Sequence, residues 1–385
     1  MIQVALRYEI VRKLGTGTVA KSYAAIERGE HGLSRPVTLK RLEGEDVSPL
    51  RLATLRELAV SHHGGLLLPR ALLVDGGGVA VVYDYVVGRS LVGLIAQCVR
   101  QKRPLPQQAA TIVFARAAEA VADLHEGWLG TASTAHGAIR PSNLLFSLLG
   151  GLWIDDAGLA ADPCELARRG TLTLGQAHFA SPEALAASLD GAEALAHKEA
   201  RANDVYGLAA CLYTLATLRL PFEETELDAL LARKRGDSPP PARQVNPHIS
   251  EELDALLATA LSPTGPRPRA RVLAQALRRL ARTEDVSPAR ELRALLDDET
   301  LAQHLELVDR CRPSQEDTSS HTPLSPSSSA ESRHGIRPPS GPLLPLPPQI
   351  EEPVHTEETV RRQVSTDHVG ASIMRNIEMA TAASF

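Results

Sequence analysis

The first 90 residues alternate short β-rich runs with turns. Hydrophobic and β-branched residues gather in runs that are separated by Gly, Pro or charged residues, which is the pattern of short strands. The runs are Tyr8–Lys13, Lys21–Ala25, Val37–Arg41, Ala71–Val74 and Val79–Tyr85. The segment 49–61 between them reads as a helix. We therefore expect a small sheet accompanied by one helix.

The rest of the ordered chain has a different periodicity. From Gln107 onward, apolar residues recur at the three- and four-residue spacing of amphipathic helices. Further helices are expected near 204–218, 250–261 and 270–282. Strands gathered at one end of a chain and followed by helices indicate an α+β protein, here with a β-rich first lobe and a helical second lobe.

The composition changes sharply near Pro313. Between Pro313 and Ile350, 18 of 38 residues are Pro or Ser, which buries little apolar surface. We expect 313–350 to be a disordered linker and 351–385 a tail. Just before them, the segment 284–312 is expected to hold appended helices. Ser287 and Pro288 are typical of a helix N-cap and first position, so we expect a helix from there toward Leu296 that packs on the second lobe.

Charge and cysteine content exclude several classes of protein. The 385 residues include 41 Lys and Arg and 46 Asp and Glu, so the net charge of -5 gives no reason to expect nucleic-acid or membrane-surface binding. The four cysteines are far apart in sequence, which indicates neither a disulfide framework nor a zinc site. With no apolar run of about 20 residues to span a bilayer, we expect a cytoplasmic protein.

Two segments of the first lobe could contact phosphate. The glycine-rich stretch 15–20 lies between two expected strands, where backbone N–H groups could approach phosphate oxygens, although an ordinary hairpin turn fits equally well. Lys40 ends an expected strand, and Glu57 lies on the expected helix, from which a carboxylate could hold the Lys ammonium. Taken alone, these two residues are a surface lysine and a helix-face charge.

The second lobe supplies the remaining motifs. They are His136-Gly137-Ala138-Ile139-Arg140-Pro141-Ser142-Asn143 and Asp155-Asp156-Ala157-Gly158. The order of glycine loop, strand Lys, helix Glu, His loop with Asn, and Asp with Gly resembles the protein kinase family, specifically bacterial serine/threonine kinases. The resemblance covers about residues 8–283, so we expect a kinase-like domain over 1–283, with the N-lobe at about 1–86 and the C-lobe at about 87–283.

The resemblance implies an ATP and Mg²⁺ site. The residues that it implies for nucleotide binding are Gly15, Gly17, Ala20, Lys40, Glu57, Tyr83 and Tyr85. The residues that it implies for the metal are Asn143 and Asp156. It also implies that Arg267 pairs with Glu183 of the triplet Ser181-Pro182-Glu183. A buried polar network without nucleotide is the alternative interpretation of the charged positions.

The departures from the family concern catalysis. Where active members have the Asp that accepts the substrate proton, this chain has Ala138, and the basic residue that follows two positions later is Arg140. Ala157 replaces the Phe of Asp-Phe-Gly, and Gln176 replaces the Thr that contacts the catalytic Asp. We do not expect Asp155 to act as a substitute base, because adjacent residues on a strand face opposite ways.

The sequence therefore favours a pseudokinase that binds ATP and Mg²⁺ and serves as a signalling scaffold or allosteric regulator. Its expected partners are signalling proteins, such as an active kinase or a phosphothreonine-binding domain. The first alternative is a slow serine/threonine kinase, because loss of a general base typically costs about 10²- to 10⁴-fold in rate. The second is a binding module that does not use nucleotide.

Overall fold

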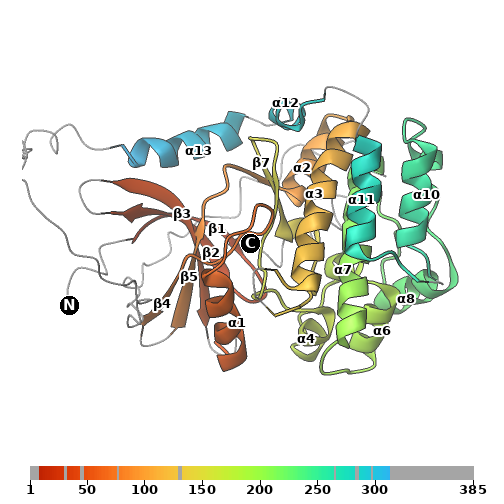
Figure 1. Cartoon of the computed structure of the whole chain (residues 1–385), viewed down its shortest axis with the longest axis horizontal. Helices are drawn as coiled ribbons and strands as arrows, with labels where there is room; N and C mark the ends of the chain where they lie inside the picture. The colour runs from red at the N-terminus through yellow and green to blue at the C-terminus, as the bar shows by residue number, and fades with distance from the viewer. Residues whose placement is uncertain are drawn as a thin grey trace, which may run out of the picture.

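The computed structural model describes residues 8–29, 33–43, 47–75, 78–128, 132–263, 266–281, 286–295 and 298–312. They form two lobes, a sheet with one helix and a larger helical body (Figure 1). The expected linker 313–350 and tail 351–385 lie outside the described residues. The expected two-lobed α+β architecture is confirmed, with its strands gathered at the N-terminal end.

The N-lobe is a five-stranded antiparallel sheet in the order β1-β2-β3-β5-β4. Its strands are β1 (Tyr8–Thr16), β2 (Lys21–Arg28), β3 (Ser34–Glu43), β4 (Ala71–Asp75) and β5 (Gly78–Asp84). Alternate residues of β5 pack on opposite faces: Val79 and Val81 join Leu55 of α1 (Pro49–Ala59), whereas Ala80 and Val82 join Leu39. This two-residue period is the strand pattern of the sequence.

The C-lobe is built mainly of helices. They are α2 (Leu91–Arg100), α3 (Gln107–Glu126), α4 (Pro163–Arg168), α5 (Leu174–Ala177), α6 (Pro182–Leu189), α7 (His197–Thr217), α8 (Leu227–Gly236), α9 (Ala242–Val245), α10 (Glu251–Ala260) and α11 (Ala270–Leu280). Helix α3 packs against α7 and α11 in one large apolar core. In α7, Gly207 faces the backbone of Ile139, where an added Cβ would lie 2.4 Å from the carbonyl oxygen. The loop that contains Ile139 therefore packs directly on α7.

A second sheet was not expected from the sequence. It has three short strands, β6 (Gly88–Ser90), β7 (Leu144–Ser147) and β8 (Leu152–Ile154), in the order β6-β7-β8. Strands this short do not contain enough positions to establish an alternating pattern. The short 3₁₀ helix η3 (Pro141–Asn143) leads into β7, so this sheet positions the His loop at the junction of the lobes.

The last described elements are α12 (Pro288–Ala294) and α13 (Asp298–Arg310). As the sequence predicts, Pro288 is at the start of α12 and the Ser287 side chain caps it by accepting from Arg290 N–H. Helix α12 contacts α3 and β7 of the C-lobe, whereas α13 lies beside the N-lobe strands (Figure 1). Among the described residues, no helix is both long and apolar enough to cross a bilayer.

Candidate functional site

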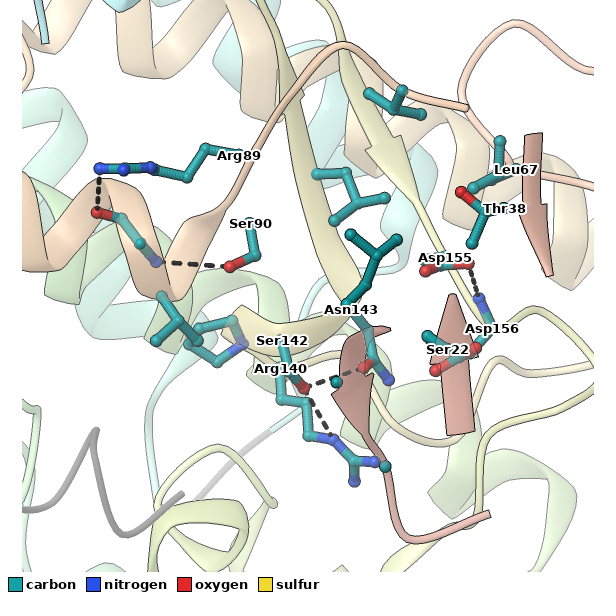
Figure 2. A pocket seen from close by; sticks show the side chains of 18 of the residues that line it. Ser22, Thr38, Leu67, Arg89, Ser90, Arg140, Ser142, Asn143, Asp155 and Asp156 are labelled. Carbon is teal, nitrogen blue, oxygen red and sulfur yellow. Dashed lines mark hydrogen bonds between the residues drawn. The ribbon is translucent and has the colours of Figure 1, made fainter. Parts of the chain in front are cut away.

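A cleft of about 550 Å³ lies between the two lobes and is lined by residues of both. Its lining includes most of the residues singled out in the sequence, namely Gly15, Gly17, Ala20, Lys40, Tyr85, Arg140, Asn143 and Asp156. Three of the predicted residues, Glu57, Tyr83 and Ala138, are not in the lining. Figure 2 shows Arg140, Ser142 and Asn143 on one side of this cleft and Asp155 and Asp156 across from them.

Lys40 lies at the centre of the cleft and pairs with two carboxylates. Its Nζ donates to Asp155 Oδ2 at 2.6 Å and also contacts Asp156 Oδ1. Burial disfavours the ammonium, but the charges of Asp155 and then Asp156 outweigh it and raise the pKa of Lys40. One buried cation therefore holds two acidic groups together.

The two carboxylates have different protonation tendencies. Burial, with the charge of Asp156 adding to it, raises the pKa of Asp155 despite the neighbouring Lys40. For Asp156, burial is outweighed by attraction to Lys40 and then Arg140, which lower its pKa. Asp156 is thus the carboxylate that stays ionised and can hold a cation.

Our expectation that Asp155 and Asp156 face opposite ways is wrong. Strand β8 ends at Ile154, so neither aspartate follows the alternation of a strand. Asp156 has φ +65°, and this left-handed backbone turns its side chain to the same ammonium that Asp155 contacts. Asp155 also accepts from its neighbour's backbone, since Asp156 N–H donates to its Oδ1 at 2.8 Å.

The expected pairing of Glu57 with Lys40 is also wrong. Glu57 is exposed, and its Oε1 accepts from Ala132 N–H at 2.8 Å. The face of α1 that meets the Asp-Ala-Gly segment instead carries Thr54 and Leu58, each of which would lie 2.9 Å from a Cβ added to Gly158. Leu55 and Leu58 define the buried side of α1, and Glu57 falls off that side because successive helix residues are about 100° apart.

The loop that carries Ala138 is held from below by α7. Asp204 is fully buried and accepts from the N–H groups of His136 and Gly137, each at 2.8 Å. His136 Nε2 is 2.8 Å from the carbonyl oxygen of Asp155, which links this loop to the carboxylate segment. Ala138 is buried, and its carbonyl accepts from Asn143 Nδ2 at 3.0 Å. These hydrogen bonds hold the loop in place, but the side chain at its centre, that of Ala138, is a methyl group.

Two residues with oxygen ligands suited to magnesium, Asn143 and Asp156, line the cleft beside this loop. Asn143 Oδ1 accepts from the Ser142 hydroxyl at 2.9 Å, and Arg140 Nε donates to Ser142 Oγ at 3.3 Å. Mg²⁺ is typically bound by one or two carboxylates together with waters and phosphates, so Asn143 and Asp156 fit such an ion. The described residues contain no cluster of three or more His, Cys, Asp or Glu that could hold a metal by itself. A metal here would need a phosphate ligand as well.

The glycine-rich turn 15–20 lines the cleft and contacts residues 156–183, which we call the activation segment. Gly17 N–H donates to Ala20 O at 2.9 Å, and a Cβ on Gly17 would lie 3.1 Å from that oxygen, so the turn is tight at this position. Gln176 Nε2 donates to Thr18 Oγ1 at 3.3 Å, and Val19 packs with Leu159 and other activation-segment residues. The glycine-rich turn of the N-lobe and the activation segment of the C-lobe are therefore in direct contact beside the cleft.

Residues 85–87 connect β5 of the N-lobe to β6 of the C-lobe, and we call this connection the hinge. Tyr85 lines the cleft. Tyr83 instead lies fully buried beneath Lys40, whose Nζ is 5.2 Å from the centre of its ring. Burial and the charges of Asp156 and Asp155 raise the pKa of Tyr83 well above its usual value. In this structure Tyr83 supports Lys40 rather than the cleft surface.

The activation segment is anchored by two cations of the C-lobe. Lys234 is buried, and its Nζ donates to three backbone carbonyls, those of Ala177, His178 and Ala180, at 2.6–2.9 Å. Arg267 pairs with Glu183 at 2.8 Å, which confirms the pairing expected from the sequence. Both cations also lie over the ring of Tyr206. These contacts fix the segment that carries Gln176.

Sequence reasoning missed three contributors to the site. Asp155 was set aside because of strand alternation, but it contacts Lys40, and the backbone turn at Asp156 brings the second carboxylate to the same ammonium. The contact of Gln176 with Thr18 joins residues 158 positions apart, which no local pattern reveals. The third contributor is α13, whose residues Thr300, Gln303 and His304 line the cleft.

Comparison with known proteins identifies the family to which this architecture belongs. A model of the protein kinase domain family matches residues 8–278. Among curated proteins, the tyrosine-protein kinase MasK of Myxococcus xanthus is 27% identical over 70% of this chain and 42% of its own length. The serine/threonine-protein kinase PrkC of Bacillus subtilis is 23% identical over 68% of this chain and 38% of its own length. CBL-interacting protein kinase 4 of Oryza sativa is 29% identical over 57% of this chain and 46% of its own length.

Among solved structures, that of Rad53 1–466 in complex with AMP-PNP superposes with a TM-score of 0.56 at 19% identity. The superposition covers 70% of this chain and 64% of that one, and it supports the two-lobed kinase fold. The chain spans less than half the length of the three curated relatives named above. Since the family match covers 8–278, with the sheet, the Lys40 site and the His loop in family order, this chain belongs to the protein kinase domain family.

Proposed function

We propose that this chain is a pseudokinase that binds ATP with Mg²⁺ and acts as a signalling scaffold or allosteric regulator. The observation that carries the proposal is Ala138, a buried methyl group at the position of the catalytic base in a loop that is otherwise fully assembled. A positioned group that accepts the hydroxyl proton typically speeds phosphoryl transfer by about 10²- to 10⁴-fold, and a methyl group cannot accept that proton.

Neither carboxylate in the cleft replaces the missing base. Asp155 and Asp156 both bond to the buried Lys40 ammonium, so each carboxylate is already engaged and is not free to take a substrate proton. In addition, Gln176 donates to Thr18, and this contact between the two lobes lies in the lining of the cleft. These contacts support a cleft that holds a ligand without processing it.

Nucleotide binding is supported by the groups that remain. Lys40 and Arg140 supply positive charge for phosphates, and Asn143 and Asp156 supply oxygen ligands for Mg²⁺. A volume of about 550 Å³ lies in the usual range for small-molecule sites. The cleft therefore has both the size and the charges that an ATP–Mg²⁺ complex needs.

The test is ATP binding by calorimetry on the full chain, with Mg²⁺ and with EDTA, beside Asp156→Ala. We expect Mg²⁺-dependent binding that Asp156→Ala abolishes. The nucleotide proposal is wrong if ATP gives no heat of binding and no thermal shift, since ligand at 100 times Kd should stabilise the protein by about 2.7 kcal/mol. That result would favour a binding module that does not use nucleotide.

The second candidate is a slow serine/threonine kinase, favoured by the retention of Arg140, Asn143 and Asp156 at the cleft. A phosphotransfer assay with labelled ATP separates the two functions. The pseudokinase proposal predicts no transfer by the natural chain and a gain in Ala138→Asp of at least about 10²-fold over background. Transfer by the natural chain that Lys40→Met removes would instead establish a kinase.

For its partners we propose signalling proteins, in particular an active kinase or a phosphothreonine-binding domain. The family membership supports a place in phosphorylation signalling, because the domain has the fold of a kinase. Co-purification followed by crosslinking of the full chain would test this. Recovery of no protein kinase or phosphopeptide-binding protein above the level of a control without the chain would count against it.

A further inference from the structure

Helices α12 and α13 follow the segment that matches the kinase family, which ends at residue 278. The first of them, α12, is fixed to the C-lobe. Leu292 and Leu295 are buried in the C-lobe core, and Glu291 pairs with Arg103 at 3.0 Å. Arg293 Nε also donates to Leu148 O at 3.1 Å. The start of this extension is therefore anchored on the larger lobe.

The second helix, α13, is fixed to the N-lobe. Leu307 is fully buried against Ala24 and Ile26 of β2. Arg28 on the same strand donates from Nη1 to Arg310 O at 3.0 Å, and Arg12 on β1 donates to Gln303 O at 3.1 Å. Because α12 sits on one lobe and α13 on the other, the extension crosses the junction of the lobes (Figure 1).

Between α12 and the buried Leu307, α13 forms hydrogen bonds with the hinge region, namely with Tyr85 and Gly88. His304 Nε2 lies 3.0 Å from Gly88 O, and its Nδ1 lies 2.7 Å from the Tyr85 hydroxyl. A carbonyl oxygen can only accept, so Nε2 carries the proton and Nδ1 accepts from Tyr85. Burial lowers the pKa of His304, with the charges of Arg12 and Arg89 adding to the effect, which keeps the ring neutral as this arrangement requires.

The same stretch of α13 forms part of the cleft wall. Thr300, Gln303 and His304 line the cleft together with Tyr85 and Gly88 of the hinge region. Arg89 also contacts the Thr300 hydroxyl from the C-lobe side. A ligand held at the hinge would consequently be enclosed by α13 as well as by the two lobes.

We propose that α12 and α13 form a strap that ties the lobes together and completes the outer wall of the ligand cleft. The part that concerns ligand affinity rests on the proposed ATP binding. A strap that restrains the lobes lowers the ordering cost of closing them on a ligand, so docked α13 strengthens binding. By linkage, bound nucleotide must stabilise the docking of α13 by the same factor.

The test compares two leucines of α13 in the full 385-residue chain. Leu307→Ser places a hydroxyl in the buried contact with β2, whereas Leu305→Ser alters a side chain that is 53% exposed on the same helix. Hydrogen exchange of β2, α13 and residues 85–90 is measured without ligand, and ATP–Mg²⁺ affinity by calorimetry. His304→Ala is a third variant that removes the hinge contacts and leaves Leu307 in place.

We expect Leu307→Ser to speed exchange at least tenfold in β2 and residues 85–90 and to weaken ATP binding at least tenfold. His304→Ala should weaken binding at least threefold, and Leu305→Ser should match the natural chain within twofold in both measurements. The proposal that α13 forms part of the cleft wall is overturned if both Leu307→Ser and His304→Ala bind ATP within twofold of the natural chain. If Leu307→Ser fails to fold, His304→Ala decides in the same way.

The failure of the proposed function has a different signature. If the natural chain binds no ATP, the nucleotide proposal is wrong. Hydrogen exchange alone then decides whether α12 and α13 tie the lobes together. Faster exchange in Leu307→Ser or His304→Ala, with Leu305→Ser unchanged, would then support it. Unchanged exchange in all three variants would overturn it.

Discussion

Lys40 donates to Asp155 at 2.6 Å in the centre of the cleft, although the family resemblance points to Glu57 as its partner. The same ammonium contacts Asp156, so one cation faces two buried carboxylates. A phosphate group entering the cleft must therefore compete with Asp155 for Lys40. This arrangement makes Asp155 an internal competitor of the ligand and leads to the first prediction.

Removing the charge of Asp155 should strengthen nucleotide binding. Asp155→Asn keeps the shape and removes one negative charge near the phosphates. Two charges about 7 Å apart at an effective dielectric constant of about 20 interact by roughly 2 kcal/mol, so affinity for ATP–Mg²⁺ should rise at least about tenfold. The matched control, Asp156→Asn, should weaken Mg²⁺-dependent binding. Calorimetry in which Asp155→Asn binds more weakly than the natural chain would contradict this account.

Removing Lys40 should destabilise the fold. Lys40→Met would leave Asp155 and Asp156 buried without their cation, and breaking a buried pair from one side typically costs about 3–5 kcal/mol. The double variant Lys40→Met with Asp155→Asn should recover part of that loss because one uncompensated charge is gone. Urea unfolding of the single and double variants measures both. Equal unfolding free energies for Lys40→Met and the natural chain would show that the pair does not hold the lobes.

Acid should destabilise the protein through His178. Burial, with the nearby charge of Lys234 adding to it, lowers the pKa of His178 to about 3. An unfolded-state histidine takes up a proton near pH 6.5, whereas the native ring stays neutral until about pH 3, so stability falls as the pH drops below 6.5. Between pH 6.5 and pH 5 this group should cost about 1.5 kcal/mol. In His178→Leu that portion of the pH dependence should vanish, and identical urea-unfolding profiles for the two proteins would refute the assignment.

Tyr83→Phe should stabilise the protein. The Tyr83 hydroxyl is buried and finds no hydrogen-bond partner within the described part of the chain. A buried hydroxyl without a partner costs about 1–3 kcal/mol, so its removal should raise the unfolding free energy by roughly 1 kcal/mol and the melting temperature by a few degrees. Calorimetric melting of the variant beside the natural chain checks this. A lower melting temperature would mean that the hydroxyl has a bonded water or ligand in solution.

Much of the N-lobe could be predicted from local pattern. The strands that hold Lys40 alternate apolar residues with the two-residue period of a sheet, and the helix 49–59 begins at a Ser48 cap with Pro49 at its first position. The same holds for α12, which starts at Ser287 and Pro288. These features depend on neighbours within a few residues, which is why the sequence alone carries them.

The candidate site was predicted as a set of positions, and its pairings were not. The resemblance to the protein kinase family located Lys40, Ala138, Arg140, Asn143 and Asp156, because each belongs to a short motif of that family. It misplaced Glu57, since the rotation of α1 about its own axis is decided by which residues pack beneath it. Asp155 was missed because β8 ends at Ile154 and the left-handed backbone of Asp156 lets both carboxylates reach Lys40, against the alternation of a strand.

The sequence by itself determined the β-rich first lobe, the helical second lobe and the identities of the residues in the kinase-like motifs, Ala138 included, because periodicity and residue identity are local properties. Tertiary structure alone decided that Lys40 is shared by Asp155 and Asp156, that Gln176 reaches Thr18, and that α13 returns to the hinge. Each of these contacts joins segments more than 100 residues apart. Such contacts arise from how whole elements pack against one another, and no window of the sequence contains both partners.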